Sequence, residues 1–252
     1  MRKRKIEDVS MPLMDHIREL RKVLIVSAYA IAIGAICGWV VSDQVFRFLA
    51  QPVLALGDRV VFVTTTPMEP ILVKLKVSVI VGIVLALPIV MWQIWSFILP
   101  ALKQNERRYL YMIVPTSLVL FAAGVAFCFF IVLRVAIGFL LFAGIEAVNS
   151  TPFVTKSSYV NFLITLFLTF GLVFQLPILL LLLIKMDIIT PKSLAKYRKW
   201  AFFGILVVCV MVSPTPDPLT QFLMAGPMYF LYEVSIWIGN VIVRRKEKAA
   251  ES

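Results

Sequence analysis

Charged residues are scarce in this chain: only 15% of its 252 residues are Asp, Glu, Lys or Arg, whereas 61% are apolar. A soluble domain usually carries about 25% charged and 45–50% apolar residues, so the composition excludes an ordinary cytosolic enzyme. The 11 glycines show no period and hydrophobicity is high, which excludes collagen-like and disordered chains. What remains is the composition of a multi-pass membrane protein.

Residue types that support catalysis or metal binding are also few. His16 is the single histidine, so neither a histidine-based metal site nor a Ser–His–Asp triad is expected. Cys37, Cys128 and Cys209 lie far apart inside apolar runs, and they predict neither a disulfide framework nor paired metal ligands. The sequence has no glycine-rich phosphate-binding motif. We therefore predict no enzyme activity, no metal and no cofactor.

Long apolar runs occupy about half of the chain, and a transmembrane helix needs about 20 such residues to cross about 30 Å of hydrocarbon. The whole chain is predicted to be one polytopic, all-α membrane domain, residues 1–252, with six transmembrane helices. The fifth run has only 13 residues, about 20 Å as a helix. We therefore expect the fifth and sixth helices to be short or incompletely spanning, or to form a re-entrant hairpin. The six predicted spans are 23–41, 77–99, 110–133, 159–184, 200–212 and 219–243.

The placement of lysine and arginine predicts the orientation. With the N-terminus inside, 19 of the 25 Lys and Arg residues lie on the cytoplasmic side, as the positive-inside rule requires. Both termini are therefore predicted to be cytoplasmic. The net charge of +11 is assigned to loops that face anionic lipid rather than to nucleic acid. The first apolar run is too long for a cleavable signal peptide, so we expect it to stay as the first span.

Prolines and external segments refine this prediction. Pro88, Pro115, Pro177 and Pro227 lie inside the predicted spans, where they should kink the bundle into a concave shape. Outside the spans, residues 60–66 are β-branched except for Phe62. The apolar run within 134–145 is too short to cross and is expected to form an interfacial helix. The two halves of the chain show no repeat, which argues against an inverted-repeat transporter.

Four polar residues near or inside the spans are candidates for function. Glu19 and Glu106 are either solvated surface charges or a pair of carboxylates that binds a dibasic ligand, because a carboxylate accepts an arginine fork bidentately. Gln175, in the middle of a span, more often hydrogen-bonds a neighbouring helix than a ligand. Glu233 must be either paired or protonated in its span, and its functional use stays open.

Seven motifs in order resemble the TatC family, the polytopic subunit of the twin-arginine protein translocase. The first is HIRELRK at 16–22, and the resemblance covers nearly the whole chain. The others are TTPMEP at 65–70, QIWSFILPAL at 93–102, ERR at 106–108, FGLVFQLP at 170–177, SPTPD at 213–217 and PMYFLYE at 227–233.

The resemblance implies a function and its residues. It implies a receptor for signal peptides bearing two consecutive arginines, in a complex that moves folded proteins across the cytoplasmic membrane using the proton-motive force. The implied partners are twin-arginine precursors, the single-span subunits TatA and, if present, TatB, further copies of this chain and membrane lipid. The implied signal-peptide site contains Glu19, Arg21, Phe97, Glu106, Arg107 and Arg108, while Pro52 and Asp217 match outer-side family positions and many relatives carry glutamate at the position of Gln175.

Two other functions stay open at the level of sequence. A small-molecule or ion secondary transporter would need several ionisable groups at mid-membrane, whereas only Glu233 and the amide Gln175 are available. A purely structural membrane scaffold would leave Glu19 and Glu106 replaceable.

Overall fold

The structure is a computed structural model that describes residues 13–55, 61–98, 107–139, 153–212 and 218–251. Most of these residues are helical, because long apolar runs in a membrane protein must satisfy their backbone polar groups within the segment itself. The helices and strands are α1 (Leu13–Leu54), β1 (Val61–Val63), α2 (Glu69–Ile98), α3 (Arg107–Phe127), the π-helical turn η4 (Cys128–Val132), β2 (Phe153–Thr155), α5 (Lys156–Val173), α6 (Leu176–Lys185), α7 (Pro191–Lys196), α8 (Arg198–Val212) and α9 (Pro218–Glu251).

Five described helical segments are long and apolar enough to cross a membrane: Ile17–Leu54, Glu69–Ile98, Tyr111–Phe139, Lys156–Lys185 and Thr220–Arg245. The fifth predicted span corresponds to α8, which has 15 residues, about 22 Å, and is short as expected. The prediction of a short sixth helix is wrong, because α9 has 34 residues.

The described chain is helical as predicted, except that β1 and β2 form a short two-stranded parallel sheet in which Val61 pairs with Phe153 and Val63 with Thr155. One further prediction needs correction. The first part of the predicted interfacial helix, up to Phe139, instead continues the third span beyond η4. The rest of that segment, from residue 140 onward, lies outside the described residues.

The prolines in the spans have different local effects. Pro88, Pro115 and Pro227 lie inside continuous helices. Pro177 instead lies in the first turn of α6, directly after the chain leaves α5. Because proline has no N–H and crowds the preceding turn, it cannot continue the α5 ladder, and Gln175 becomes the N-cap residue of α6. The fourth span is therefore two helices with a break in the middle.

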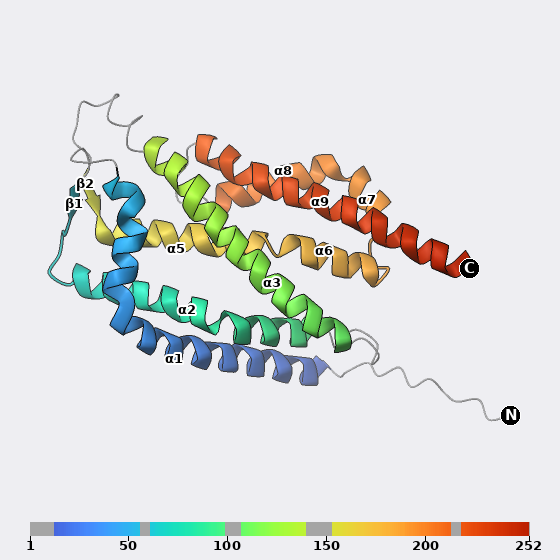
Figure 1. The fold of residues 1–252 in the computed structure, drawn as a ribbon, viewed down its shortest axis with the longest axis horizontal. Coiled ribbons are helices and arrows are strands. Elements are labelled where there is room, and N and C mark those ends of the chain that lie inside the picture. The colour runs from blue at the N-terminus through green and yellow to red at the C-terminus, as the bar shows by residue number, and fades with distance from the viewer. Residues whose placement is uncertain (1–12, 56–60, 99–106, 140–152, 213–217, 252) are drawn as a thin grey trace.

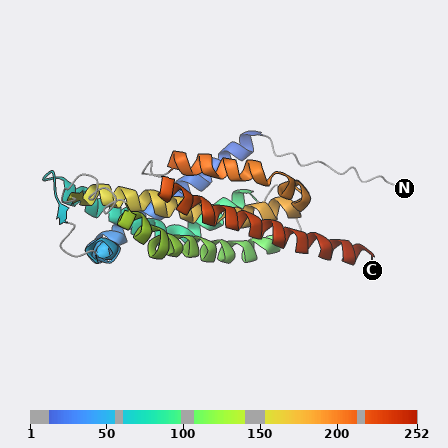
Figure 2. The same cartoon turned by 90° about the horizontal axis from the view of Figure 1, so that it is seen from above.

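The helices run back and forth along the long axis of the molecule, with α3 crossing the others obliquely (Figure 1). The starts of α1 and α3 and the ends of α2, α6 and α9 lie at one end, which we call the inner end after its predicted cytoplasmic side. The starts of α2, α5 and α9, together with both strands, lie at the opposite end, the outer end. Figure 2 shows the same division of ends from above.

Helices α1 and α2 pack closely enough that glycine is required between them. A Cβ atom added to Gly82 would lie 2.6 Å from the backbone nitrogen of Ala35 and 2.7 Å from the carbonyl oxygen of Ile31. On α1, Gly34 and Gly38 approach α2 equally closely, with 2.8 Å from a Gly34 Cβ to the Gly82 carbonyl oxygen. Small residues that let helix backbones meet are typical of membrane helix pairs. We call α1 and α2 together the hairpin.

The largest buried cluster includes residues of η4, α5, α8 and α9, and it also takes in Leu49 and Val53 near the end of α1. Cys128, Leu163, Phe170, Cys209 and Met224 are fully or almost fully buried within it. A second cluster joins the inner half of α2 to α3 and α6 and consists of Met91, Trp95, Val114, Phe121, Ile178 and Leu182. The body of the molecule is therefore held together mainly by apolar side chains.

Candidate functional site

Glu19, the first candidate carboxylate, lies in the second turn of α1 at the inner end and is partly buried. Next to it is an open hollow of about 440 Å³ lined by Arg18, Arg21, Lys22, Ile25 and Val26. Arg21 is exposed. Glu19 is therefore flanked in sequence by the three cationic residues that line this hollow.

The other predicted site residues converge on the same end as far as the structure describes them. Phe97 lies in the last turn of α2 and is partly buried. Arg107 and Arg108 open α3, although their side chains are not described, and Glu106 lies outside the described residues. The rings of Trp92 and Tyr111 meet edge to face, 5.6 Å apart, and so join α2 to α3 near this end.

Gln175 occupies the break between α5 and α6 and reaches a neighbouring helix. Its Nε2 donates a hydrogen bond of 3.0 Å to the carbonyl oxygen of Ser117 in α3. Its Oε1 is buried and has no hydrogen-bond partner among the described residues. This is the interhelical bond that the sequence led us to expect, and it leaves one acceptor of the amide available for a further donor.

Glu233 of α9 is paired. Its Oε2 lies 2.8 Å from a guanidinium nitrogen of Arg198, at the start of α8, and its Oε1 accepts a hydrogen bond of 2.9 Å from the Tyr229 hydroxyl. Nearby, the Tyr232 hydroxyl donates to the carbonyl oxygen of Leu194 in α7. These contacts tie the short α8 to α9, so the charge of Glu233 is used for the structure of this corner.

The predicted outer-side residues are Pro52 and Asp217. Pro52 lies near the end of α1 and is partly buried, three residues after Leu49, whose carbonyl oxygen accepts a hydrogen bond from the Tyr159 hydroxyl of α5. Asp217 lies outside the described residues. In the described part of the chain, no group of three His, Cys, Asp or Glu side chains could hold a metal ion.

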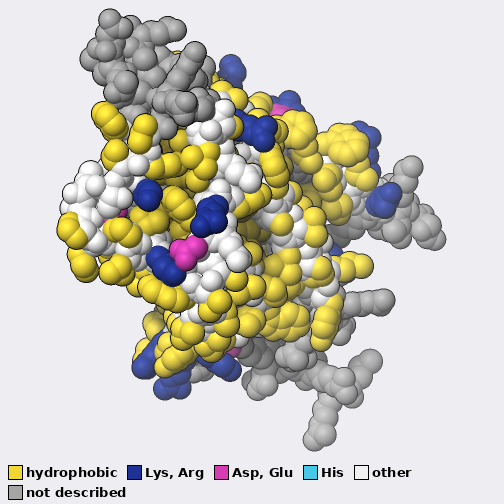
Figure 3. Space-filling view, turned by 60° about the vertical axis from the view of Figure 1, so that its left-hand side comes forward, with side chains coloured by type: hydrophobic (Ala, Val, Ile, Leu, Met, Phe, Trp, Pro, Cys, Tyr) yellow, Lys and Arg dark blue, Asp and Glu magenta, His cyan; other side chains and the backbone are white. Residues whose placement is uncertain are grey.

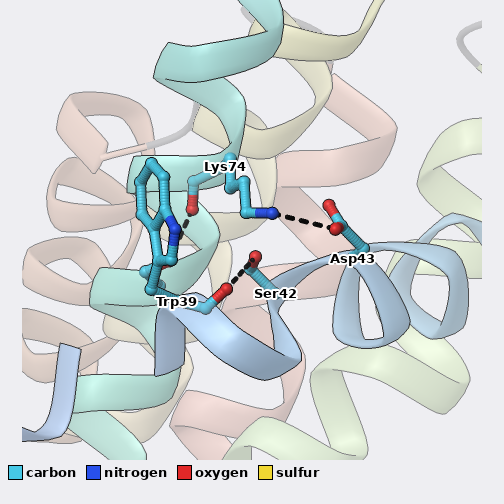
Figure 4. A network of polar contacts seen from close by, with 5 residues as sticks. Trp39, Ser42, Asp43 and Lys74 are labelled. Atoms are coloured by element: carbon cyan, nitrogen blue, oxygen red, sulfur yellow. Dashed lines mark hydrogen bonds and ion pairs between the residues drawn. The ribbon is translucent and has the colours of Figure 1, made fainter. Parts of the chain in front are cut away.

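Sequence reasoning missed the polar contacts at the outer end. Lys74 of α2 forms an ion pair of 2.9 Å with Asp43 of α1 and lies 5.3 Å from the ring centre of Trp39 (Figure 4). Lys76 and Glu69 both contact Ser157 at the start of α5. Figure 3 turns this end toward the viewer and shows acidic and basic side chains close together in a largely hydrophobic surface.

These residues were missed because the second span was predicted to begin at residue 77, where the charges end. The helix itself begins at Glu69, so Glu69, Lys74 and Lys76 belong to its first two turns. The sequence did contain a signal for this longer helix: an acidic residue is followed 5 and 7 positions later by lysines, just before an apolar run. The prediction from sequence places these residues in a loop.

The helices and polar contacts together define a multi-pass helical membrane protein whose basic inner end carries the candidate binding residues. The sequence profile of the family described as "Sec-independent protein translocase protein (TatC)" matches residues 15–227. Among named relatives, the TatC protein of Carboxydothermus hydrogenoformans is 41% identical over 98% of this chain and 99% of that protein. The TatC protein of Escherichia coli strain K12 is 32% identical over 98% of this chain and 94% of that protein.

A solved structure described as "Crystal Structure of Twin Arginine Translocase Receptor- TatC" matches the fold. Its TM-score is 0.79 and its sequence identity 38%, and the match covers 90% of this chain and 98% of that one. The chain therefore belongs to the TatC family and is a multi-pass protein of the cytoplasmic membrane.

Proposed function

We propose that this chain is the signal-peptide receptor subunit of a twin-arginine translocase. It binds precursors that carry two consecutive arginines and nucleates the complex that moves them, folded, across the membrane using the proton-motive force. The supporting observation is the similarity along nearly the whole chain to TatC proteins, one of which is described as the translocase receptor. The chain has no enzymatic role of its own in this proposal.

Glu19 and Glu106 are the residues that bind the arginine pair in this proposal. Each carboxylate accepts a planar guanidinium fork, and two carboxylates at the inner end bind two forks. Phe97 supplies an apolar surface beside them. Arg21, Arg107 and Arg108 repel a positively charged ligand elsewhere in the site. A signal peptide therefore binds only when the spacing of its two arginines brings each of them to a carboxylate.

The test of the overall function is transport in cells that lack their own TatC subunit. A folded reporter with a twin-arginine signal peptide should reach the outer side when this chain is expressed together with TatA and, where needed, TatB subunits. The same reporter with a twin-lysine signal should stay inside. Export of neither reporter at normal membrane abundance of the chain would count against the function.

Six crossings with both termini cytoplasmic is the topology proposed here, with α8 as the fifth crossing. The alternation of helix directions in Figure 1 and the common end of α1 and α9 support it. A 15-residue α8 is shorter than the hydrocarbon thickness, so this corner needs a thinner bilayer or shielding by neighbours. The bundle is proposed to be concave, as its interrupted and proline-containing helices favour.

Cysteine labelling tests this topology. In a variant without native cysteines, a single cysteine placed after Arg245 should react with a membrane-impermeant maleimide only in opened cells. A cysteine placed at Thr64, beside β1, should react in intact cells. Labelling of the tail cysteine from outside intact cells would contradict the topology.

Gln175, a partly buried side chain at the α5–α6 break, is proposed to contact a partner helix or the signal peptide, because its Oε1 has no hydrogen-bond partner among the described residues. Loss of the bond to Ser117 costs only about 0.6–2 kcal/mol, so Gln175→Leu should accumulate normally yet transport less of the reporter. Gln175→Glu is nearly isosteric, keeps an acceptor and should be tolerated. Reporter export and membrane abundance are measured together, and full export by Gln175→Leu would mean that the position only packs.

The secondary-transporter alternative receives no support from the described polar residues. Glu233 is engaged by Arg198 and Tyr229, and Gln175 is an amide. The TatC relatives also give no reason to prefer it.

A further inference from the structure

Glu69 is the only charged side chain among the described residues that is buried, with 3% of its surface exposed. It is the first residue of α2, at the outer end. Its Oε2 accepts hydrogen bonds from the backbone nitrogen and hydroxyl of Thr65, at 2.7 and 3.0 Å. Its Oε1 accepts a hydrogen bond of 2.9 Å from the backbone nitrogen of Ser157. One carboxylate therefore bridges two segments that are 88 residues apart.

The bridge satisfies groups that would otherwise lack partners. Ser157 lies in the first turn of α5, where backbone N–H groups have no acceptor within the helix. A negative charge is also favoured at the start of both α2 and α5 by the helix dipole. Burial of the carboxylate is tolerated because both oxygens accept hydrogen bonds.

Lys76 engages the same residue from two turns further along α2. Its Nζ lies 2.9 Å from the Ser157 hydroxyl, so Ser157 is contacted by one acidic and one basic side chain of α2. We call Glu69, Lys76 and Ser157 the outer clamp. The parallel pairing of β1 with β2 ties the same two chain segments, since β1 precedes α2 and β2 runs directly into α5.

The outer clamp joins two parts of the molecule that carry different candidate residues. The hairpin carries Glu19, Arg21 and Phe97 at its inner end. The α5–α6 break carries Gln175. At the inner end the hairpin meets α3 and α6 through the apolar cluster around Trp95, and apolar packing is not directional. At the outer end, α2 and α5 share the apolar cluster of Val73, Val77 and Val160, and the polar, directional contacts between these two helices lie there as well.

Because α2 is long, a small tilt at the outer clamp displaces the inner end of the helix. Helix α2 has 30 residues, which corresponds to about 45 Å. A tilt of about 5° at its outer end would therefore move its inner end by about 4 Å. Such a displacement would leave each carboxylate and arginine intact but would shift the hairpin relative to α5 and α6.

We propose that Glu69 is a positioning residue for transport. By clamping α2 to α5 at the outer end, it fixes the position of the precursor-binding hairpin relative to the α5–α6 break. Precursor binding itself uses residues of the inner end and does not need the clamp. The transport step, in which a bound precursor must engage groups on both parts, does need it. This inference rests on the proposed receptor function.

The test compares binding with transport in Glu69→Gln. The amide matches the carboxylate in shape but offers one acceptor oxygen and one donor, so it cannot accept from both the Thr65 and Ser157 backbone nitrogens. We expect normal membrane abundance, precursor affinity within about twofold of the parent, and reporter export reduced about tenfold or more. Asp43→Asn is the matched carboxylate control, because Asp43 is exposed near the same end and its ion pair with Lys74 lies within the hairpin.

A disulfide between the strands should replace the clamp. Val61 and Phe153 are register partners with exposed side chains, and the spacing of paired strands, about 4.8 Å, falls in the Cα range of disulfides. In Glu69→Gln with Val61→Cys, Phe153→Cys and Cys37→Ser, oxidation should restore export and reduction should abolish it again. If Glu69→Gln alone fails to accumulate, binding and export can still be measured with the disulfide variant. The oxidised protein is allowed to accumulate and is then reduced in isolated membranes.

The outcomes separate this inference from the receptor function. Normal export by Glu69→Gln, loss of precursor binding in parallel with export, or failure of the disulfide to restore export would each overturn the positioning role. Failure of the unmodified chain to bind a twin-arginine precursor would instead overturn the receptor function.

Discussion

Glu106→Gln is expected to weaken the binding of a twin-arginine precursor at least about tenfold, because a hydrogen bond between charged groups contributes about 1.5–3 kcal/mol. The double variant Glu19→Ala, Glu106→Ala should bind no measurable precursor. Without these carboxylates the inner end presents Arg18, Arg21 and Lys22 to a ligand that is itself positive, so attraction is replaced by repulsion. Affinity is measured with the purified protein in nanodiscs and a fluorescent signal peptide.

Asp187→Asn is the matched control. Asp187 is exposed at the inner end, in the turn after α6, and has a φ of 56°, which asparagine tolerates. The substitution removes one negative charge from the same surface and should leave the affinity for the precursor unchanged. Equal affinity of the double variant and the parent would show that the two glutamates are only surface charges.

The second large effect is expected at Gly82. Gly82→Ala places a Cβ atom within 2.6 Å of the Ala35 backbone nitrogen, so α1 and α2 must move apart, and overpacking of this kind costs about 1–3 kcal/mol. Gly82→Val should cost more and prevent accumulation of folded protein. The melting temperature in detergent, followed by size-exclusion chromatography, measures both variants.

Gly204→Ala provides the comparison. Gly204 lies in α8, is exposed, and a Cβ atom there would meet nothing within 4 Å. Since alanine is the better helix former by about 1 kcal/mol, this variant should melt at the same temperature as the parent or above it. If Gly82→Ala melted like Gly204→Ala, the close approach of α1 and α2 would not be a requirement of the fold.

The sequence predicts the apolar segments well because crossing a bilayer requires long apolar runs, which can be read locally. It predicts helix ends poorly. Helix α2 begins at Glu69 rather than at the predicted residue 77, because the charges of its first two turns find partners on α1 and α5 that no local pattern identifies. The pairing of Val61 with Phe153 is likewise a contact between segments distant in sequence.

For the polar residues, the sequence likewise predicts that a partner is needed but not which partner it is. That Gln175 needs a hydrogen-bond partner follows from an amide inside a span, but the choice of the Ser117 carbonyl oxygen depends on how α3 crosses α5. That Glu233 needs a partner also follows from its position, while Arg198 is supplied by another helix. For Glu19 and Glu106, the charges alone leave open whether they are surface carboxylates or a pair that binds a dibasic ligand, and the resemblance to TatC favours the pair.

The most direct test of the receptor function is site-specific photocrosslinking in membranes that contain this protein. A photoreactive residue is placed next to the arginine pair of a precursor, and the adduct is mapped by mass spectrometry. The account predicts an adduct in the first turns of α1 or the last turn of α2, near Glu19 and Phe97, which disappears with a twin-lysine precursor and in the Glu19→Ala, Glu106→Ala variant. An adduct of equal yield with twin-lysine, or one mapped to the outer end, would contradict it.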